Sequence, residues 1–307
     1  MSENKDLVSN EQVINNYYEK LIKTVNDSDI NDLKKLQIMK VIINKYNNQI
    51  NKDKGKKNTN SSALLVGINY FYSQYQLYGC INDVNCVKSL LQSKNFNKIT
   101  LLTDDNSNQG IPTKDTIINE LINLLINAKP GDTVFVHYSG HGSDCPDRNN
   151  DELRGYDQMI IPSDFNAIID DEIRKIIDKY LKPNVTLFGI MDCCYSGSNW
   201  DLKYQHLDSF NKNKLTINNK QKETKGRVIM ISGCTDKQTS ADAFINGSYN
   251  GALTASFLEC YNKLPQKDLT WRNLILGMRL YLKKNGYPQI PQLSSGKLLD
   301  INSRLPF

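Results

Sequence analysis

The chain has 307 residues, of which 39% are hydrophobic and 23% charged, and its formal net charge is +5 at pH 7. These values are ordinary for a soluble globular protein with one main domain and an appendage. No apolar run approaches the roughly 20 residues that a membrane-spanning helix needs. The polar start MSENKDLVSN also lacks the apolar core of a secretory signal. We therefore expect an intracellular, cytoplasmic protein that has no membrane partner.

The cysteines indicate a reducing compartment. There are seven of them in a chain too large to need disulfide stapling. Cys193 and Cys194 are adjacent, which suits free thiols better than a cross-linked framework. The modest positive charge has no aromatic residues interleaved to stack bases, so we expect no nucleic-acid partner.

Residues 1–60 are predicted to form a helical N-terminal extension and linker. Apolar residues recur at helical spacing, which predicts helices over 11–25 and 30–50. The segment Asn51 to Ser62 is rich in Lys, Asn and Ser and is interpreted as a linker. A solvated extension is favoured over a dedicated regulatory pro-segment on composition alone.

From Ala63 the pattern changes to alternating strands and helices. The predicted strands cover 63–68, 99–103, 133–137, 158–161, 185–191, 227–232 and 289–293. The predicted helices cover 81–92, 113–128, 170–181, 251–264 and 271–284. This alternation predicts an α/β fold, a three-layer sandwich around a mostly parallel sheet. The polar stretch 203–226 is interpreted as a surface loop, a natural position for a proteolytic nick.

Two of the predicted strands end in reactive side chains. One delivers Asp192, Cys193 and Cys194, and another ends in His141, flanked by glycines. Loops beyond the carboxyl ends of parallel strands form the ligand crevice of such sheets. We expect Cys194 to be a nucleophile and His141 its base and acid. The glycines would let a backbone N–H near them, or near Cys194, stabilise an oxyanion.

These residues also allow other interpretations. A single Cys at a strand end is more often core than nucleophile. His137 is expected in the core and His206 in solvent. Zinc is disfavoured, because the spacing of the candidate ligands follows no zinc pattern; these candidates are His137, His141, Cys145, Cys193 and Cys194.

Four acids form a second group: Asp157, Asp170, Asp171 and Asp201. An Asp at a helix start caps free N–H groups, which explains one of the adjacent pair. Two adjacent Asp with further loop acids are also the oxygen ligands that calcium prefers. Both interpretations stay open on the residues alone.

Seven segments in order resemble the metacaspases, calcium-dependent relatives of the caspases. The resemblance covers Ala63 to the C-terminus. The segments are Ala-Leu-Leu-Val-Gly-Ile-Asn-Tyr, Leu-Tyr-Gly-Cys-Ile-Asn-Asp-Val, His-Tyr-Ser-Gly-His-Gly, Gly-Tyr-Asp-Gln-Met-Ile-Ile-Pro-Ser-Asp, Ile-Ile-Asp-Asp-Glu-Ile, Met-Asp-Cys-Cys-Tyr-Ser-Gly-Ser and Ile-Ser-Gly-Cys-Thr-Asp-Lys-Gln-Thr-Ser-Ala-Asp-Ala. The spacing of about fifty residues between His141 and Cys194 is typical of caspase-type enzymes.

The resemblance implies the caspase-hemoglobinase fold and a calcium-activated cysteine endopeptidase. It also implies a monomer that acts on protein or peptide substrates. It implies a Cys194/His141 dyad and a pocket lined by Asp83, Asp192, Cys80 and Ser139, so that cleavage follows Arg or Lys. It also implies that Ca²⁺ is bound at the positions of Asp157, Asp170, Asp171 and Asp201.

The domain pattern resembles the type I arrangement. It has a large-subunit-like region at 61–202, the loop 203–226 and a small-subunit-like region at 227–307. Tyr195 stands where the family usually has His. Self-processing of a zymogen is expected at Lys222, Lys225 or Arg227, or in the basic linker 52–57. The alternative function is a non-catalytic, metacaspase-like regulator that binds partners.

Overall fold

The computed structural model describes residues 17, 19–21, 23–28, 34, 38, 41–42, 60–105, 110–147, 155–194, 200–206, 215–233, 242–245 and 248–307. The chain divides into two units, Met1–Lys57 with Lys297–Asp300, and Asn58–Gly296 with Ile301–Phe307. In the first unit, residues 17, 19–21, 23–26, 34, 38 and 41–42 are helical. Most of the two helices predicted before residue 60 lies outside the described residues.

The second unit is built on an eight-stranded sheet with the order β2-β1-β3-β7-β10-β13-β8-β9. Five strands are parallel: β2 (Lys98–Thr103), β1 (Ser61–Gly67), β3 (Thr133–Ser139), β7 (Thr186–Asp192) and β10 (Arg227–Ser232). Three antiparallel strands complete it: β13 (Gln292–Ser295), β8 (Tyr204–His206) and β9 (Leu215–Ile217). The mostly parallel sheet predicted from the sequence is confirmed.

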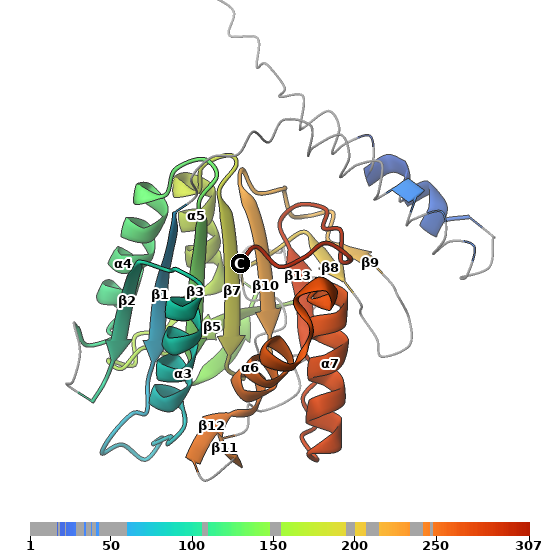
Figure 1. The fold of residues 1–307 in the computed structure, drawn as a ribbon. Helices are drawn as coiled ribbons and strands as arrows, with labels where there is room; N and C mark the ends of the chain where they lie inside the picture. The colour runs from blue at the N-terminus through green and yellow to red at the C-terminus, as the bar shows by residue number, and fades with distance from the viewer. Residues whose placement is uncertain are drawn as a thin grey trace, which may run out of the picture. The chain divides into compact units, whose positions relative to one another are not determined.

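Helices cover both faces of this sheet (Figure 1). On one face α4 (Lys114–Asn127) and α5 (Asp170–Tyr180) pack in a cluster with Leu64 and Val66 of β1. The other face carries α3 (Cys80–Ser93), α6 (Ala252–Lys263) and α7 (Trp271–Lys284). There Phe188 of β7 contacts the ring of Trp271 at 4.9 Å between centroids. Successive strand residues point to opposite faces, so apolar runs such as the one in β1 supply two cores at once.

Smaller elements complete the second unit. A three-stranded antiparallel sheet is formed by β4 (Gly142–Pro146), β5 (Tyr156–Ile160) and β6 (Ile168–Ile169). The hairpin of β11 (Asp242–Ile245) and β12 (Ser248–Gly251) leads directly into α6. A short 3₁₀ helix, η1 (Gln266–Asp268), joins α6 to α7. The last strand, β13, begins just after Pro291, because proline cannot donate to the ladder.

The polar stretch 203–226 is not a loop throughout, as the sequence had suggested. Its residues form β8 and β9, which extend the main sheet. The prediction that His206 is solvated is wrong, because it is buried and its Nε2 lies 2.8 Å from Oγ of Ser295. Burial lowers the pKa of His206 to about 3. Pairing of β8 with β13, far away in sequence, covers this side chain.

Within the described part of the chain, the helices are too short or too polar for any of them to cross a membrane.

Candidate active site

Strands β3 and β7 are parallel neighbours, and their last residues, Ser139 and Asp192, stand in register. The chain leaves both strands at the same edge of the sheet. The N–H of Gly140 donates to the carbonyl oxygen of Asp192 at 3.3 Å. Gly142 lies so close to the carbonyl oxygen of Cys194 that a Cβ at position 142 would overlap it. The topology therefore brings the segments that carry His141 and Cys194 together, and the close approach requires glycine.

The two adjacent cysteines are not equally accessible. The side chain of Cys193 is 0% exposed, whereas Cys194 is half-buried. The sulfur of Cys193 packs 3.2 Å from the position that a Cβ of residue 142 would take. Only a thiol that reaches the surface can meet a polypeptide, which singles out Cys194 of this pair. Tyr195, the departure from the family pattern, lies outside the described residues.

The imidazole of His141 has a fixed orientation. Its Nε2 lies 2.7 Å from the carbonyl oxygen of Tyr75. Because a carbonyl oxygen only accepts, the ring must donate the proton of Nε2 in this contact. Nδ1 is then the nitrogen with a free lone pair, available to a thiol proton. Sequence reasoning missed Tyr75, since a backbone carbonyl leaves no signal in residue identity.

Two tyrosine hydroxyls hold the backbone of His141. The N–H of His141 donates to the hydroxyl of Tyr70 at 2.8 Å, and the hydroxyl of Tyr138 donates to the carbonyl oxygen of His141 at 2.8 Å. The two hydroxyl oxygens are 3.1 Å apart. Burial raises the pKa of both hydroxyls above the ordinary value, so both stay protonated. A Cβ at Gly140 would lie 2.7 Å from the Tyr138 oxygen, so this arrangement also needs glycine.

Two buried carboxylates, those of Asp83 and Asp192, flank the start of α6. The N–H of Gly251 donates to both oxygens of Asp83, at 3.0 and 2.9 Å, and Oγ of Ser139 donates to its Oδ2 at 2.7 Å. The N–H and the hydroxyl of Thr254 each donate to Oδ2 of Asp192 at 2.8 Å. A Cβ on Gly251 would lie 2.7 Å from Oδ2 of Asp83 and would overlap Oδ2 of Asp192. The free N–H groups and dipole of a helix N-terminus favour negative charge, so α6 stabilises both carboxylates.

The remaining members of the predicted pocket lie beside these carboxylates. Cys80 is buried in the first turn of α3, one turn before Asp83, and its N–H donates to Oδ1 of Asn69 at 3.1 Å. Ser139 ends β3 and bonds Asp83 directly. Sequence reasoning missed Gly251, which bonds Asp83 from 168 positions away, and Thr254, which bonds Asp192 from 62 positions away. Both approach their carboxylates only through the fold.

His137 is a core residue, as predicted. It is fully buried, and its Nε2 lies 3.0 Å from Oγ1 of Thr254. The single hydroxyl proton of Thr254 is given to Asp192, so Nε2 of His137 must be the donor in this pair. Burial lowers the pKa of His137 to about 3, which keeps the ring neutral.

Comparisons with known proteins agree with this geometry. The model of the metacaspase, peptidase C14 domain, matches residues 61–203. Metacaspase-2 of Trypanosoma brucei brucei is 36% identical over 258 residues, which cover 78% of this chain and 74% of that protein. The chain belongs to the metacaspase family. It is therefore a cysteine endopeptidase, and its substrates are proteins.

Two further matches support the family and the fold. Metacaspase-1 of Schizosaccharomyces pombe is 35% identical over 292 residues, covering 78% of this chain and 68% of that protein. The solved structure of protein GSU0716 from Geobacter sulfurreducens has a TM-score of 0.58 at 23% identity. The aligned region covers 81% of this chain and 98% of the Geobacter protein. At this identity the match shows the fold alone. The sheet order and the layers of this metacaspase agree with the caspase-hemoglobinase fold.

The four acids expected to bind calcium lie around the N-terminus of α5. Asp157 is buried on β5, and Asp170 is buried at the first position of α5. Oδ2 of Asp170 accepts from the N–H of Gln158 at 2.8 Å, so these two acids are neighbours through β5. Oδ1 of Asp170 accepts from the N–H of Asp171 at 3.0 Å, but the N-cap residue of α5 is Ile169, which makes no side-chain capping bond.

The other two acids are engaged differently. Asp171 forms an ion pair of 3.2 Å with Lys175. Asp201 is buried, and its carbonyl oxygen accepts from Nη1 of Arg174, a buried guanidinium that the sequence did not single out. Among the residues that the structure describes, no three His, Cys, Asp or Glu side chains are grouped to hold a metal ion. The donor atoms suit calcium in kind, but these carboxylates do not form a finished site in this conformation.

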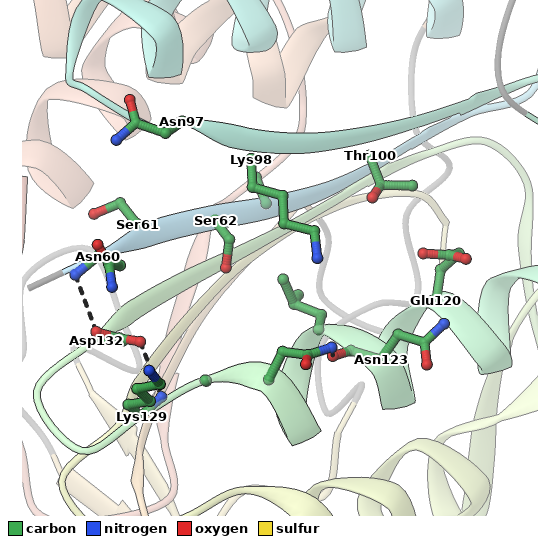
Figure 2. Close-up of a pocket in the computed structure, with 14 residues that line it drawn as sticks. Asn60, Ser61, Ser62, Asn97, Lys98, Thr100, Glu120, Asn123, Lys129 and Asp132 are labelled. Atoms are coloured by element: carbon green, nitrogen blue, oxygen red, sulfur yellow. Dashed lines mark hydrogen bonds between the residues drawn. The ribbon is translucent and has the colours of Figure 1, made fainter.

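A groove of about 290 Å³ lies at the opposite end of the sheet (Figure 2). It lies between the amino ends of β1 and β2 and the C-terminal half of α4, and Lys98, Glu120 and Asn123 are among its lining residues. None of its lining residues is a Cys or His. Because His141 and Cys194 follow the carboxyl ends of the parallel strands, this groove is separate from the active site.

Proposed function

We propose that this metacaspase cleaves peptide bonds after Arg or Lys through a Cys194/His141 dyad, and that calcium activates it. The observation that supports this best is the pair of buried carboxylates, Asp83 and Asp192, on either side of Gly251. Asp192 is the last residue of β7, the strand that leads into Cys194, and Asp83 lies in the first turn of α3. Two buried carboxylates close together attract a cation far more strongly than they would in water.

In the proposed reaction, Nδ1 of His141 takes the proton of the Cys194 thiol, and the sulfur attacks the backbone carbonyl carbon of the Arg or Lys residue. The protonated imidazole then gives this proton to the nitrogen of the leaving amine, and a thioester remains. Water, deprotonated by the same imidazole, attacks the thioester carbonyl. The C–S bond breaks, the imidazole returns the proton to the sulfur of Cys194, and the carboxylic acid product leaves. Since the N–H of Gly140 already bonds Asp192, the N–H of Gly142 is the candidate donor from this glycine segment to the oxyanion.

A thiol-reactive probe that carries Arg tests the dyad and the specificity together. We expect mass spectrometry to find the adduct on Cys194 and none on buried Cys193. A matched probe that carries Asp should label at least tenfold more slowly, since the pocket would repel its carboxylate. Failure of both probes to label Cys194, with calcium present and residues 1–60 removed, would favour a non-catalytic regulator.

We propose that Asp157, Asp170, Asp171 and Asp201 hold the calcium ion. Burial of three of these acids supports the proposal, as does the bond from the N–H of Gln158, next to Asp157, to Asp170. Bound calcium would supply positive charge among them, and binding would have to draw the carboxylates closer together. Calorimetric titration of calcium into Cys194→Ala tests this without activity. Binding that persists in an Asp170→Ala, Asp171→Ala variant of that protein would exclude these ligands.

We also propose that the enzyme is a monomer that processes itself in the basic linker 52–57, which lies outside the described residues. The alternative positions are Lys222, Lys225 and Arg227. Lys225 is exposed, whereas the backbones of Lys222 and Arg227 are tied into the fold. The carbonyl oxygen of Lys222 accepts from Nη2 of Arg174 at 2.6 Å, and the N–H of Arg227 donates to Val185 at 2.8 Å. Mass spectrometry of the calcium-treated enzyme should find cuts in 52–57, and light scattering should give the mass of one chain.

A further inference from the structure

Two exposed aromatic rings, Tyr75 and Phe165, stand beside His141. Tyr75 is 53% exposed and Phe165 is 50% exposed. Their ring centroids are 6.0 Å apart, and the ring of Tyr75 is 6.3 Å from the imidazole of His141. The buried ring of Tyr70 lies 4.7 Å from that imidazole and 5.8 Å from Phe165. An apolar surface therefore begins at the imidazole and extends outward, and contiguous exposed apolar surface marks an interaction site.

The loop that presents Phe165 is held in place. The N–H of Phe165 donates to the carbonyl oxygen of Pro162 at 2.9 Å, and the N–H of Ser163 donates to Pro112 at 3.0 Å. The hydroxyl of Tyr70 donates to the carbonyl oxygen of Ile161 at 2.6 Å. Phe165 has a φ of 59°, which is unusual for a bulky residue and persists only where surrounding contacts enforce it. The ring is thus exposed from an ordered backbone, which lowers the entropy lost when a ligand packs on it.

The chemistry of the cut fixes which side of the substrate meets these rings. The imidazole of His141 must reach the nitrogen of the leaving amine, so it faces the residues after the cut bond. The residue before the cut bond lies toward Asp83 and Asp192. On that side, the ring centroids of Tyr78, just before α3, and Tyr249, on β12, are 5.3 Å apart. Tyr75 and Phe165 therefore border the leaving part of the substrate.

We propose that Tyr75 and Phe165 form a subsite for an apolar or aromatic side chain within the first two residues after the cut bond. The subsite rests on the proposed Arg/Lys cleavage through Cys194 and His141. It adds a second specificity element to the acidic pocket. Substrates would then be selected by a cation before the cut and by an apolar side chain after it.

Internally quenched peptides test the subsite. All carry the same residues up to Arg, and the two residues after it are Phe or Leu in one set and Gly or Asp in another. An Arg-aminocoumarin amide, which has no residues after the cut, is the matched substrate. We expect wild type to prefer the Phe and Leu set by about tenfold in kcat/KM. In Phe165→Ala this preference should fall to about twofold or less, with the amide cleaved as in wild type.

Two control variants sharpen the result. Tyr72→Ala removes another ring, which is fully exposed and lies against Phe71, and it should keep the wild-type preference. Phe165→Leu keeps an apolar surface and should restore most of it. A wild type with no preference, or a Phe165→Ala variant that keeps it, would overturn the subsite while amide cleavage upholds the proposed function. If wild type does not cleave the amide, both the proposed function and the subsite are overturned.

Discussion

The hydroxyl and the backbone N–H of Thr254 both donate to Oδ2 of Asp192, each at 2.8 Å. Behind the hydroxyl, Nε2 of buried His137 donates to it at 3.0 Å. A line of donors thus runs from β3 through α6 to one carboxylate oxygen. The hydroxyl of Thr254 has one proton, which it donates to Asp192, and it accepts the proton of His137 Nε2. These hydrogen bonds fix the direction of the Asp192 carboxylate before any substrate binds.

Thr254→Val removes the hydroxyl and keeps the shape of the side chain and its N–H. The variant should raise KM for Arg and Lys substrates by roughly tenfold, because a hydrogen bond to a charged group contributes about 1.5–3 kcal/mol. Denaturant unfolding should also show a loss of about 1–3 kcal/mol, since the buried donor of His137 loses its acceptor. Thr254→Ser, which keeps the hydroxyl, should restore both quantities. An unchanged KM in the Val variant would contradict this role.

Gly251→Ala places a methyl group between the two carboxylates. Its backbone φ of −68° suits alanine, so the effect comes from the overlap with Asp192 and the close approach to Asp83. We expect kcat/KM for Arg substrates to fall roughly a hundredfold, since a misplaced binding group can cost this much. Gly110→Ala is the control, because its added methyl would meet its nearest neighbour at 3.4 Å. Steady-state kinetics that do not distinguish the two variants would count against the carboxylate pair.

Tyr138→Phe removes the hydroxyl that donates to the carbonyl oxygen of His141. The imidazole should then be positioned less well, and kcat should fall about tenfold with little change in KM. Tyr204→Phe is the matched control. Tyr204 is a buried tyrosine on strand β8, and its hydroxyl donates to Glu223 at 2.7 Å. Both variants should lose similar stability, about 1 kcal/mol. Equal kcat in the two variants would leave Tyr138 with a structural role only.

His206 should make the protein sensitive to acid. Its pKa is about 3 in the folded chain, against an ordinary value of 6.5. Between these values the unfolded chain binds a proton that the folded chain does not, so stability falls as the pH falls from about 6.5 toward 3. From pH 6 to pH 4, wild type should lose about 2–3 kcal/mol more than His206→Gln. Urea unfolding at both pH values measures this, and parallel losses in the two proteins would refute it.

Local pattern was sufficient for the frame of the fold. Apolar runs bounded by polar residues located the five parallel strands, and helical spacing located the helices between them. The expectation that Cys194 and His141 meet also followed from sequence, because parallel strands end at one edge of a sheet. The family resemblance added Asp83 and Asp192, which composition alone could not connect.

What the sequence could not reveal depends on pairing between distant segments. The carbonyl of Tyr75 is a backbone group that every residue has, so residue type does not reveal its role, yet it fixes the tautomer of His141. In the sequence, Thr254 looks like an ordinary residue in the first turn of a helix. Its role becomes visible only where α6 packs beside Asp192. His206 reads as solvated because its neighbours are polar, and only the contact of β8 with β13 buries it.

The most direct test of the account is cleavage of fluorogenic peptides ending in Arg, Lys or Asp, with calcium or with a chelator. The native chain is compared with Cys194→Ala. We predict release after Arg and Lys only, dependent on calcium and lost in the variant. Release after Asp, or release that persists in Cys194→Ala, would contradict the proposed dyad and its acidic pocket.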